Sequence, residues 1–158
     1  VCEKIAIGPE ETSGELFDAV SAIGAKTLAA ALPKIAAGEL HPQKQDEALA
    51  TKAPPLSKEL ARFSFAEPAT HIHNWVRGMN PWPMAFFEYG GKKIKVCASR
   101  LAENPDRAAP GTVLALKPLT VACGEGAVTL ESITPEGGKP MTGTAWAAGR
   151  RLKAGDSL

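Results

Sequence analysis

The sequence predicts a mainly β domain with flanking helices, an OB-like barrel of five to six strands, preceded by a strand and a helix of α/β type. Three observations lead to this fold class. Short apolar segments with period-two alternation, separated by glycine turns, fill the second half of the chain. A strand-like segment and a long helical pattern open it. A polar stretch with prolines separates the two parts.

The first elements expected are a strand at residues 5–7 and a helix that begins just after Thr12. Thr12 and Glu15 have the S/T-x-x-E spacing of a capping box. Gly24 and Pro33 interrupt the apolar spacing that follows, so the helix is expected to kink or divide there. A lone strand cannot bury both of its faces, so these elements are expected to belong to a larger parallel sheet.

A linker is expected at residues 39–58, which are polar, lack apolar periodicity and contain Pro54-Pro55. The predicted division of the chain is therefore 1–38, 39–58 and 59–158. The next helix is predicted from Pro68 to Gly78, because proline suits the first turn of a helix.

Beyond Asn80 the apolar spacing changes to period two. Strands are predicted at residues 84–89, 93–98, 112–116, 119–123 and 127–133, and a closing helix at residues 142–150. Gly90-Gly91 accepts the positive φ angles of a tight hairpin between the first two strands. Five short strands with a flanking helix favour a closed or nearly closed barrel, and a sandwich is the alternative.

Trp82 lies between Pro81 and Pro83, in the loop expected before the first strand. A proline restricts the residue before it to extended backbone, so the indole has a fixed direction. We expect the ring to pack over the end of the barrel, with stacking on a nucleobase as the less favoured alternative.

Composition and motifs argue against several classes of protein. No apolar run approaches the roughly 20 residues that cross a bilayer, and the N-terminus lacks the pattern of a signal peptide. Cys2, Cys97 and Cys123 form no C-x-x-C pair, which argues against a zinc ribbon or a disulfide framework. His71 and His73 point in different directions on a helix, so they are expected to be surface or capping residues. We expect a cytoplasmic, monomeric protein with no catalytic, metal or cofactor site, no DNA partner and no membrane association.

Positive charge is concentrated in the second part of the chain. Residues 1–50 carry 4 Lys and Arg against 8 Asp and Glu, a net charge of −4, whereas residues 51–158 carry 14 against 9, a net charge of +5. Basic side chains gather on the predicted hairpin and near the chain end: Lys92, Lys93, Lys95, Arg150, Arg151 and Lys153. Such groups on one face of an OB-like fold would track RNA phosphates. Equally, lysines at a sheet edge discourage aggregation, which would account for Lys92 and Lys93.

Several stretches resemble methionyl-tRNA formyltransferases in order and spacing, over nearly the whole chain. They are Ile7-Gly8-Pro9-Glu10-Glu11-Thr12-Ser13-Gly14-Glu15-Leu16, Gln45-Asp46-Glu47 with Ala50-Thr51, Leu56-Ser57-Lys58-Glu59, Asn80-Pro81-Trp82-Pro83, Ala109-Pro110-Gly111-Thr112, Gly124-Glu125-Gly126 and Gly149-Arg150-Arg151-Leu152-Lys153. The resemblance implies that residues 1–38 end a Rossmann-like catalytic domain and that residues 59–158 form the C-terminal tRNA-binding domain. It also implies formyl transfer from 10-formyltetrahydrofolate to methionine on initiator tRNA.

The resemblance implies no catalytic role for the residues present, because the family's catalytic Asn, His and Asp would precede Val1. This portion alone is expected to be inactive and to bind no cofactor. The implied tRNA-binding residues are Lys58, Arg62, Lys92, Lys93, Lys95, Arg150, Arg151 and Lys153. The alternatives are the C-terminal barrel of another folate-dependent formyltransferase or hydrolase, and a structural module that makes no contact with RNA.

Overall fold

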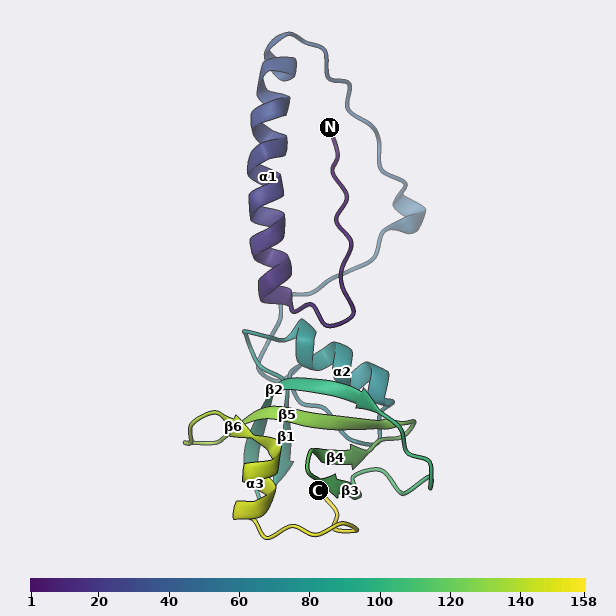
Figure 1. Ribbon diagram of the computed structural model, residues 1–158. Coiled ribbons are helices and arrows are strands. Elements are labelled where there is room, and N and C mark those ends of the chain that lie inside the picture. Colours follow the sequence, from purple (N-terminus) through teal and green to yellow (C-terminus); the bar gives the residue numbers. More distant parts are fainter. The chain divides into compact units, whose positions relative to one another are not determined.

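Two units make up the chain, Val1–Leu56 and Ser57–Leu158, in the computed structural model, which describes residues 1–158 (Figure 1). The boundary lies inside the stretch expected to be a linker, near its C-terminal end.

A single long helix, α1 (Ser13–Ala36), dominates the first unit. The predicted capping box is confirmed: the Thr12 hydroxyl accepts from the Glu15 N–H at 3.3 Å, and the Glu15 carboxylate accepts from the Thr12 N–H at 2.9 Å. The helix is not divided at Gly24 or Pro33. Pro33 lies in the last turn, where the cost of its missing N–H is confined to the end of the helix.

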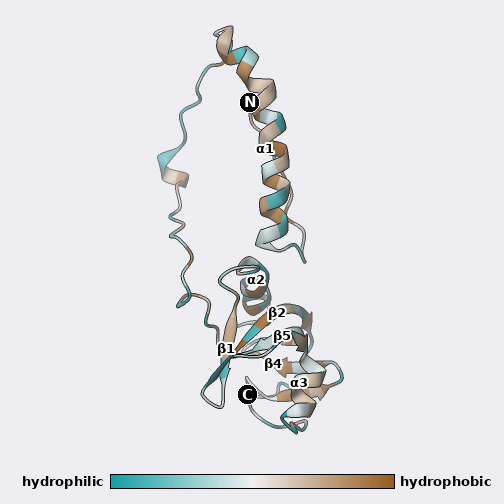
Figure 2. Cartoon of the chain, turned by 90° about the vertical axis from the view of Figure 1, so that its left-hand side faces the viewer, coloured by the Kyte–Doolittle hydropathy of each residue, from teal (hydrophilic) through white to brown (hydrophobic).

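No residue of α1 is buried, although the helix is rich in apolar side chains (Figure 2). Phe17 is 72% exposed and Leu28 is 58% exposed. By length and composition alone, α1 is long and apolar enough to cross a membrane. The sequence analysis expected no segment able to cross a bilayer and did not identify α1, because scattered Lys and Gly residues interrupt its apolar run. One helix of this kind is weak support for a membrane span, since core helices of soluble proteins meet the same criteria.

The strand expected at residues 5–7 is absent. A strand requires a neighbouring strand that accepts its ladder of hydrogen bonds, and no segment of this unit supplies one. The rest of the unit is irregular apart from η1 (Glu47–Leu49), a 3₁₀ turn whose N-cap Asp46 accepts from the Ala48 N–H at 2.9 Å.

The second unit is a six-stranded antiparallel sheet with two helices, which confirms the predicted mainly β class. Its elements are α2 (Ala69–Gly78), β1 (Phe86–Tyr89), β2 (Lys92–Ala102), β3 (Val113–Leu116), β4 (Leu119–Ala122), β5 (Ala127–Pro135), β6 (Met141–Thr142) and α3 (Gly143–Gly149). All five predicted strands are present, and β6 was missed because it contains two residues. The turn between β1 and β2 is as expected, since Gly90 and Gly91 have φ of 58° and 72°.

The sheet runs in the order β1-β2-β5-β4-β3, with β6 also paired to β5. No ladder joins β1 to β3, so the sheet is open rather than a closed barrel. Each outer strand instead meets a short irregular segment. Phe86 of β1 bonds to Ala61 and Phe63, and Val113 of β3 bonds to Gly155 and Asp156.

One hydrophobic core fills the second unit. Ile72 and Val76 of α2, together with Trp146 of α3, pack with inward-facing residues of all five long strands. Leu130 and Ile133 of β5 are among the largest fully buried side chains. Because the hydrophobic effect scales with the apolar area removed from water, this unit holds nearly all of the chain's burial energy.

Candidate nucleic-acid interface

The eight basic residues predicted to bind tRNA are all exposed, and the structure separates most of them into two groups. The first, which we call the hairpin patch, consists of Arg62, Lys93 and Lys95. The second, the C-terminal cluster, consists of Arg150, Arg151 and Lys153. Lys58 lies beside the first group, and Lys92 lies between the two.

The hairpin patch is built around Phe86 of β1. Lys95 lies opposite Phe86 in the β1–β2 register, and Lys93 Nζ is 4.8 Å from the centre of the phenyl ring. Arg62 forms a bridge to Phe86 from the segment on the other side of β1. Residues i and i+2 of a strand share a face, so Lys93 and Lys95 project on the same side of β2. Cationic residues from two distant parts of the sequence therefore flank Phe86.

Acidic side chains offset part of this charge. Arg62 pairs with Glu88 at 3.3 Å, and Glu88 lies opposite Lys93 in the register. Nearby, the pKa of the Glu59 carboxyl is lowered mainly by the hydrogen bond from Ser57 and to a smaller extent by the charges of Lys58 and Lys93. Lys58 thus belongs with the hairpin patch, and the patch as a whole is a mixed-charge surface.

Protection of a sheet edge, the alternative for Lys92 and Lys93, does not explain the lysines of β2. β2 is an interior strand, flanked by β1 and β5, and the outer side of β1 is covered by the 61–63 segment. Lysines that guard an edge belong on strands with unpaired backbone groups. Lys93 and Lys95 project from the face of the sheet, where a ligand can reach them.

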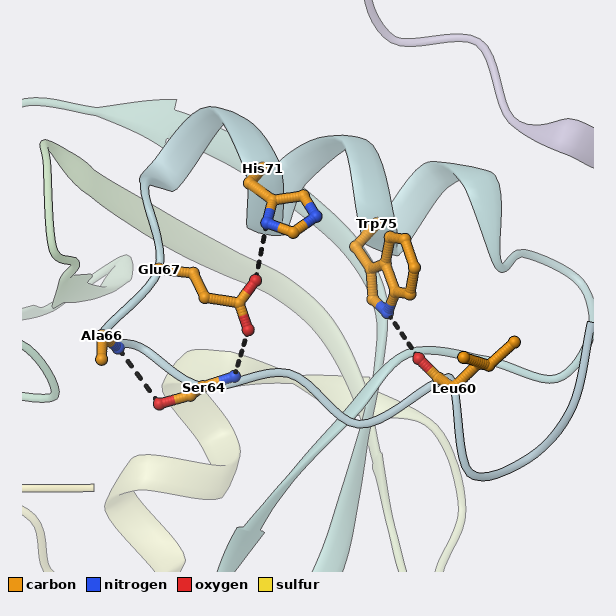
Figure 3. A network of polar contacts seen from close by, with 6 residues as sticks. All are labelled: Leu60, Ser64, Ala66, Glu67, His71 and Trp75. Atoms are coloured by element: carbon orange, nitrogen blue, oxygen red, sulfur yellow. Dashed lines mark hydrogen bonds and ion pairs between the residues drawn. The ribbon is translucent and has the colours of Figure 1, made fainter. Parts of the chain in front are cut away.

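A network of polar contacts fixes the segment that carries Arg62 (Figure 3). The Trp75 indole N–H donates to the Leu60 carbonyl at 2.9 Å. Glu67 accepts from the Ser64 N–H at 3.1 Å and pairs with His71 Nδ1 at 2.6 Å, so one carboxylate ties this segment to α2. Arg62 lies between these two attachments and is therefore held against the sheet.

The C-terminal cluster follows α3. Arg150 is the C-cap residue, Arg151 has a φ of 55°, and Leu152 between Arg151 and Lys153 is buried. The Asp156 carboxylate accepts from the Lys153 backbone N–H at 2.7 Å, closing a tight turn. The side chains of Arg150, Arg151 and Lys153 form no ion pair. In contrast to Arg62 of the hairpin patch, none of these three side chains is in an ion pair, although the Asp156 carboxylate lies beside Lys153.

Lys92 lies between the two groups, at the tip of the hairpin. Lys92 lies opposite Tyr89 in the β1–β2 register. The ring centre of Tyr89 is 5.3 Å from that of Trp146 in α3. Arg150 follows one turn later and donates its backbone N–H to the Trp146 carbonyl at 3.1 Å. The hairpin tip and the end of α3 are thus neighbours. Arg100, a further exposed basic residue on β2, pairs with Glu131 at 2.6 Å and belongs to neither group.

Other polar side chains of this unit do not form a reactive constellation. His71 faces Glu67, whereas His73 is buried with its Nδ1 3.1 Å from the Ser99 hydroxyl, so the prediction of two surface or capping histidines is wrong for His73. Burial raises the pKa of the Cys123 thiol to about 12, which keeps it protonated and non-nucleophilic near neutral pH. A cleft of about 560 Å³ lies at the open edge of the sheet. Its lining includes three carboxylates, from Glu59, Glu67 and Glu88, and a single cation, Arg62. That charge balance disfavours phosphate in the cleft.

Trp82 departs from its expected role. It is 55% exposed, whereas Pro83 beside it is buried. The prediction that its ring packs over the barrel end is wrong, because the corner is filled by Pro83, Met79 and Ala85 instead. The sequence signal was ambiguous, since a tryptophan between two prolines has a fixed direction but nothing in the pattern states whether that direction is inward.

Comparison with protein families gives one matching family model, described as "Formyl transferase, C-terminal domain", over residues 55–151. Similar proteins include the methionyl-tRNA formyltransferase of Solibacter usitatus, 42% identical over 96% of this chain and 49% of that protein. The methionyl-tRNA formyltransferase of Bacillus subtilis is 38% identical over 98% of this chain and 50% of that protein. The chain spans about half the length of the curated relatives it matches.

Among solved structures, HypX from Aquifex aeolicus is similar in fold. One variant of it has a TM-score of 0.68 at 17% identity, covering 98% of this chain and 29% of that chain. HypX in complex with tetrahydrofolic acid has a TM-score of 0.60 at 21% identity, covering 84% of this chain and 24% of that chain. At such low identity the likeness concerns the fold.

Proposed function

We propose that this chain, which belongs to the formyl transferase family through its C-terminal domain, is the tRNA-binding portion of a methionyl-tRNA formyltransferase. The family match and the 38–42% identity to methionyl-tRNA formyltransferases support the parent activity. In that activity the whole protein transfers a formyl group from 10-formyltetrahydrofolate to methionine on initiator tRNA in the cytoplasm. The portion described here, with its OB-like sheet, holds the tRNA and is inactive alone.

The C-terminal cluster is the observation that carries this proposal. Three exposed cations without ion pairs, next to Lys92 at the hairpin tip, form a surface that attracts a polyanion. RNA backbone phosphates suit such a surface, because each neutralised phosphate releases condensed counterions. The hairpin patch contributes less to RNA binding, because the Arg62 guanidinium already pairs with the Glu88 carboxylate.

Binding of labelled initiator tRNA to the chain, followed by fluorescence anisotropy between 50 and 300 mM salt, tests the proposal. Affinity should fall steeply with salt. Replacing Arg150, Arg151 and Lys153 together by Ala should weaken binding and reduce the salt slope by about 2 to 3, close to one per lost phosphate contact. The matched control is Arg100→Ala, because Arg100 is also exposed but is paired with Glu131. An unchanged slope in the triple variant would refute the assignment.

An assay of formyl transfer distinguishes this parent enzyme from a relative that formylates another amine. The full-length parent should formylate charged initiator tRNA with 10-formyltetrahydrofolate, and the triple variant of the parent should show a raised KM for tRNA with an unchanged KM for the folate. Faster turnover of a small free amine than of the charged tRNA would favour the other formyltransferase class.

A further inference from the structure

Trp82 is an exposed aromatic side chain in a corner where several neighbouring residues are buried. Its exposed fraction is 55%, whereas that of Met79 before it is 3% and that of Ala85 after it is 0%. The other two tryptophans are accounted for by the fold: Trp146 is 3% exposed in the core, and Trp75 donates to the Leu60 carbonyl. Trp82 is thus the one indole with no evident task in stabilising the domain.

The loop that carries Trp82 is fixed at both ends. The Met84 N–H donates to the Met79 carbonyl at 2.9 Å, closing the loop, and the Asn80 side-chain amide donates to the Cys97 carbonyl of β2 at 2.8 Å. Pro81 and Pro83 have fixed φ angles, and Pro83 also restricts the backbone of Trp82. A ring held in this way loses little conformational entropy when a ligand covers it, since its backbone is already ordered.

The bond between Asn80 and Cys97 also relates Trp82 to the hairpin patch. Trp82 is two residues from Asn80, at most about 8 Å along the chain. Lys95 is two residues from Cys97, about 7 Å along β2. Lys93 follows on the same face, with its Nζ 4.8 Å from the Phe86 ring. The bond therefore ties the loop that carries the exposed indole to the strand that carries Lys95 and Lys93.

We propose that Trp82 is a stacking site for an unpaired nucleotide base of the bound RNA, whose adjacent phosphates lie along Lys95 and Lys93. Proteins that hold single strands combine cations that follow the backbone with aromatic rings that take the bases. The base must be unpaired, because the faces of a base inside a duplex are covered by its neighbours. This inference rests on the proposed tRNA binding and adds to it a contact that is not electrostatic.

The test compares Trp82→Ala with Trp82→Phe in the whole chain, using two probes: a fluorescein-labelled single-stranded RNA of eight uridines and a blunt RNA duplex. Trp82→Ala should weaken binding of the single strand by about 5- to 150-fold without changing its salt slope. Trp82→Phe should retain most of the affinity. Neither variant should alter duplex binding. The thermal midpoint should be unchanged in both variants, because the side chain is exposed.

Intrinsic fluorescence supplies a readout that does not depend on affinity. Saturating single-stranded RNA should quench the indole emission of the native chain, and this quenching should be absent from Trp82→Phe. Unchanged single-strand affinity in Trp82→Ala, while the native chain binds tRNA with a steep salt dependence, would overturn the stacking site and leave the proposed function standing. Failure of the native chain to bind any RNA at low salt would overturn both.

Discussion

The two units of the chain differ in how they are stabilised. Ser57–Leu158 buries a continuous core that joins two helices to a six-stranded sheet. Val1–Leu56 contains a 24-residue helix without a buried residue, although Phe17, Leu28, Leu32 and Ile35 recur along it. Apolar periodicity predicts the face that a helix buries, but the burial itself requires a surface that faces it. The second unit supplies its own, and the first does not.

A matched pair of leucines should show the largest difference between the units. Leu130 is 1% exposed and Leu28 is 58% exposed. Leu130→Ala should lower the free energy of unfolding by about 2 to 5 kcal/mol through lost burial and a residual cavity. Leu28→Ala should change it by less than about 0.5 kcal/mol. Urea denaturation measures both, followed by tryptophan fluorescence for the second unit, which contains all three tryptophans, and by far-UV circular dichroism for α1. A loss at Leu28 as large as that at Leu130 would show that α1 is buried against another surface in solution.

A pair of glycines should give smaller changes in stability, and the two changes should have opposite signs. A Cβ built on Gly143, at the start of α3, would overlap the Leu130 carbonyl, whereas a Cβ on Gly24 in α1 meets no atom within 4 Å. Gly143→Ala should destabilise the second unit by about 1 to 3 kcal/mol through overpacking. Gly24→Ala should stabilise α1 by about 1 kcal/mol, since alanine has the higher helix propensity. Thermal melts monitored by near-UV and far-UV circular dichroism distinguish the two units, and destabilisation by Gly24→Ala would contradict the open surroundings of that residue.

The capping box of α1 should give the smallest effect, confined to the first unit. Without tertiary burial the helix depends on its caps and propensities, so Thr12→Ala should cost about 1 kcal/mol of helix stability and reduce the ellipticity at 222 nm. Ser21→Ala, in the middle of the same helix, is the control and should not reduce it. Near-UV signals from the second unit should stay the same in both variants.

The same box should make α1 sensitive to acid. The pKa of Glu15 is lowered because its carboxylate accepts hydrogen bonds from the Thr12 backbone N–H and then from the Thr12 hydroxyl. A lowered pKa in the folded state means that the stabilisation is complete above the usual glutamate value of about 4.3 and is lost as the pH falls through the lower folded value. Helicity should decline over that range in the native chain and less in Glu15→Gln, which has no carboxylate to protonate. An equal decline in both would contradict the role of Glu15.

Local sequence signals predicted most of the fold because they act over a few residues. Thr12 and Glu15 marked the start of α1, Gly90-Gly91 marked the hairpin, and period-two alternation located all five long strands. The errors arose where a neighbour distant in sequence decides the outcome. Residues 5–7 have the composition of a strand but no strand beside them, and the sheet ends at irregular segments instead of closing into a barrel.

For the candidate interface, the sequence by itself determined which residues carry charge and that they occur in clusters. Only the tertiary structure decided which charges act together. Arg62 meets Lys93 and Lys95 at Phe86 across a gap of more than 20 residues, and Glu88 partly neutralises the group. The tertiary structure also turned Trp82 outward. Charge and chain direction are local properties, whereas ion pairing and exposure depend on what the fold places beside each side chain.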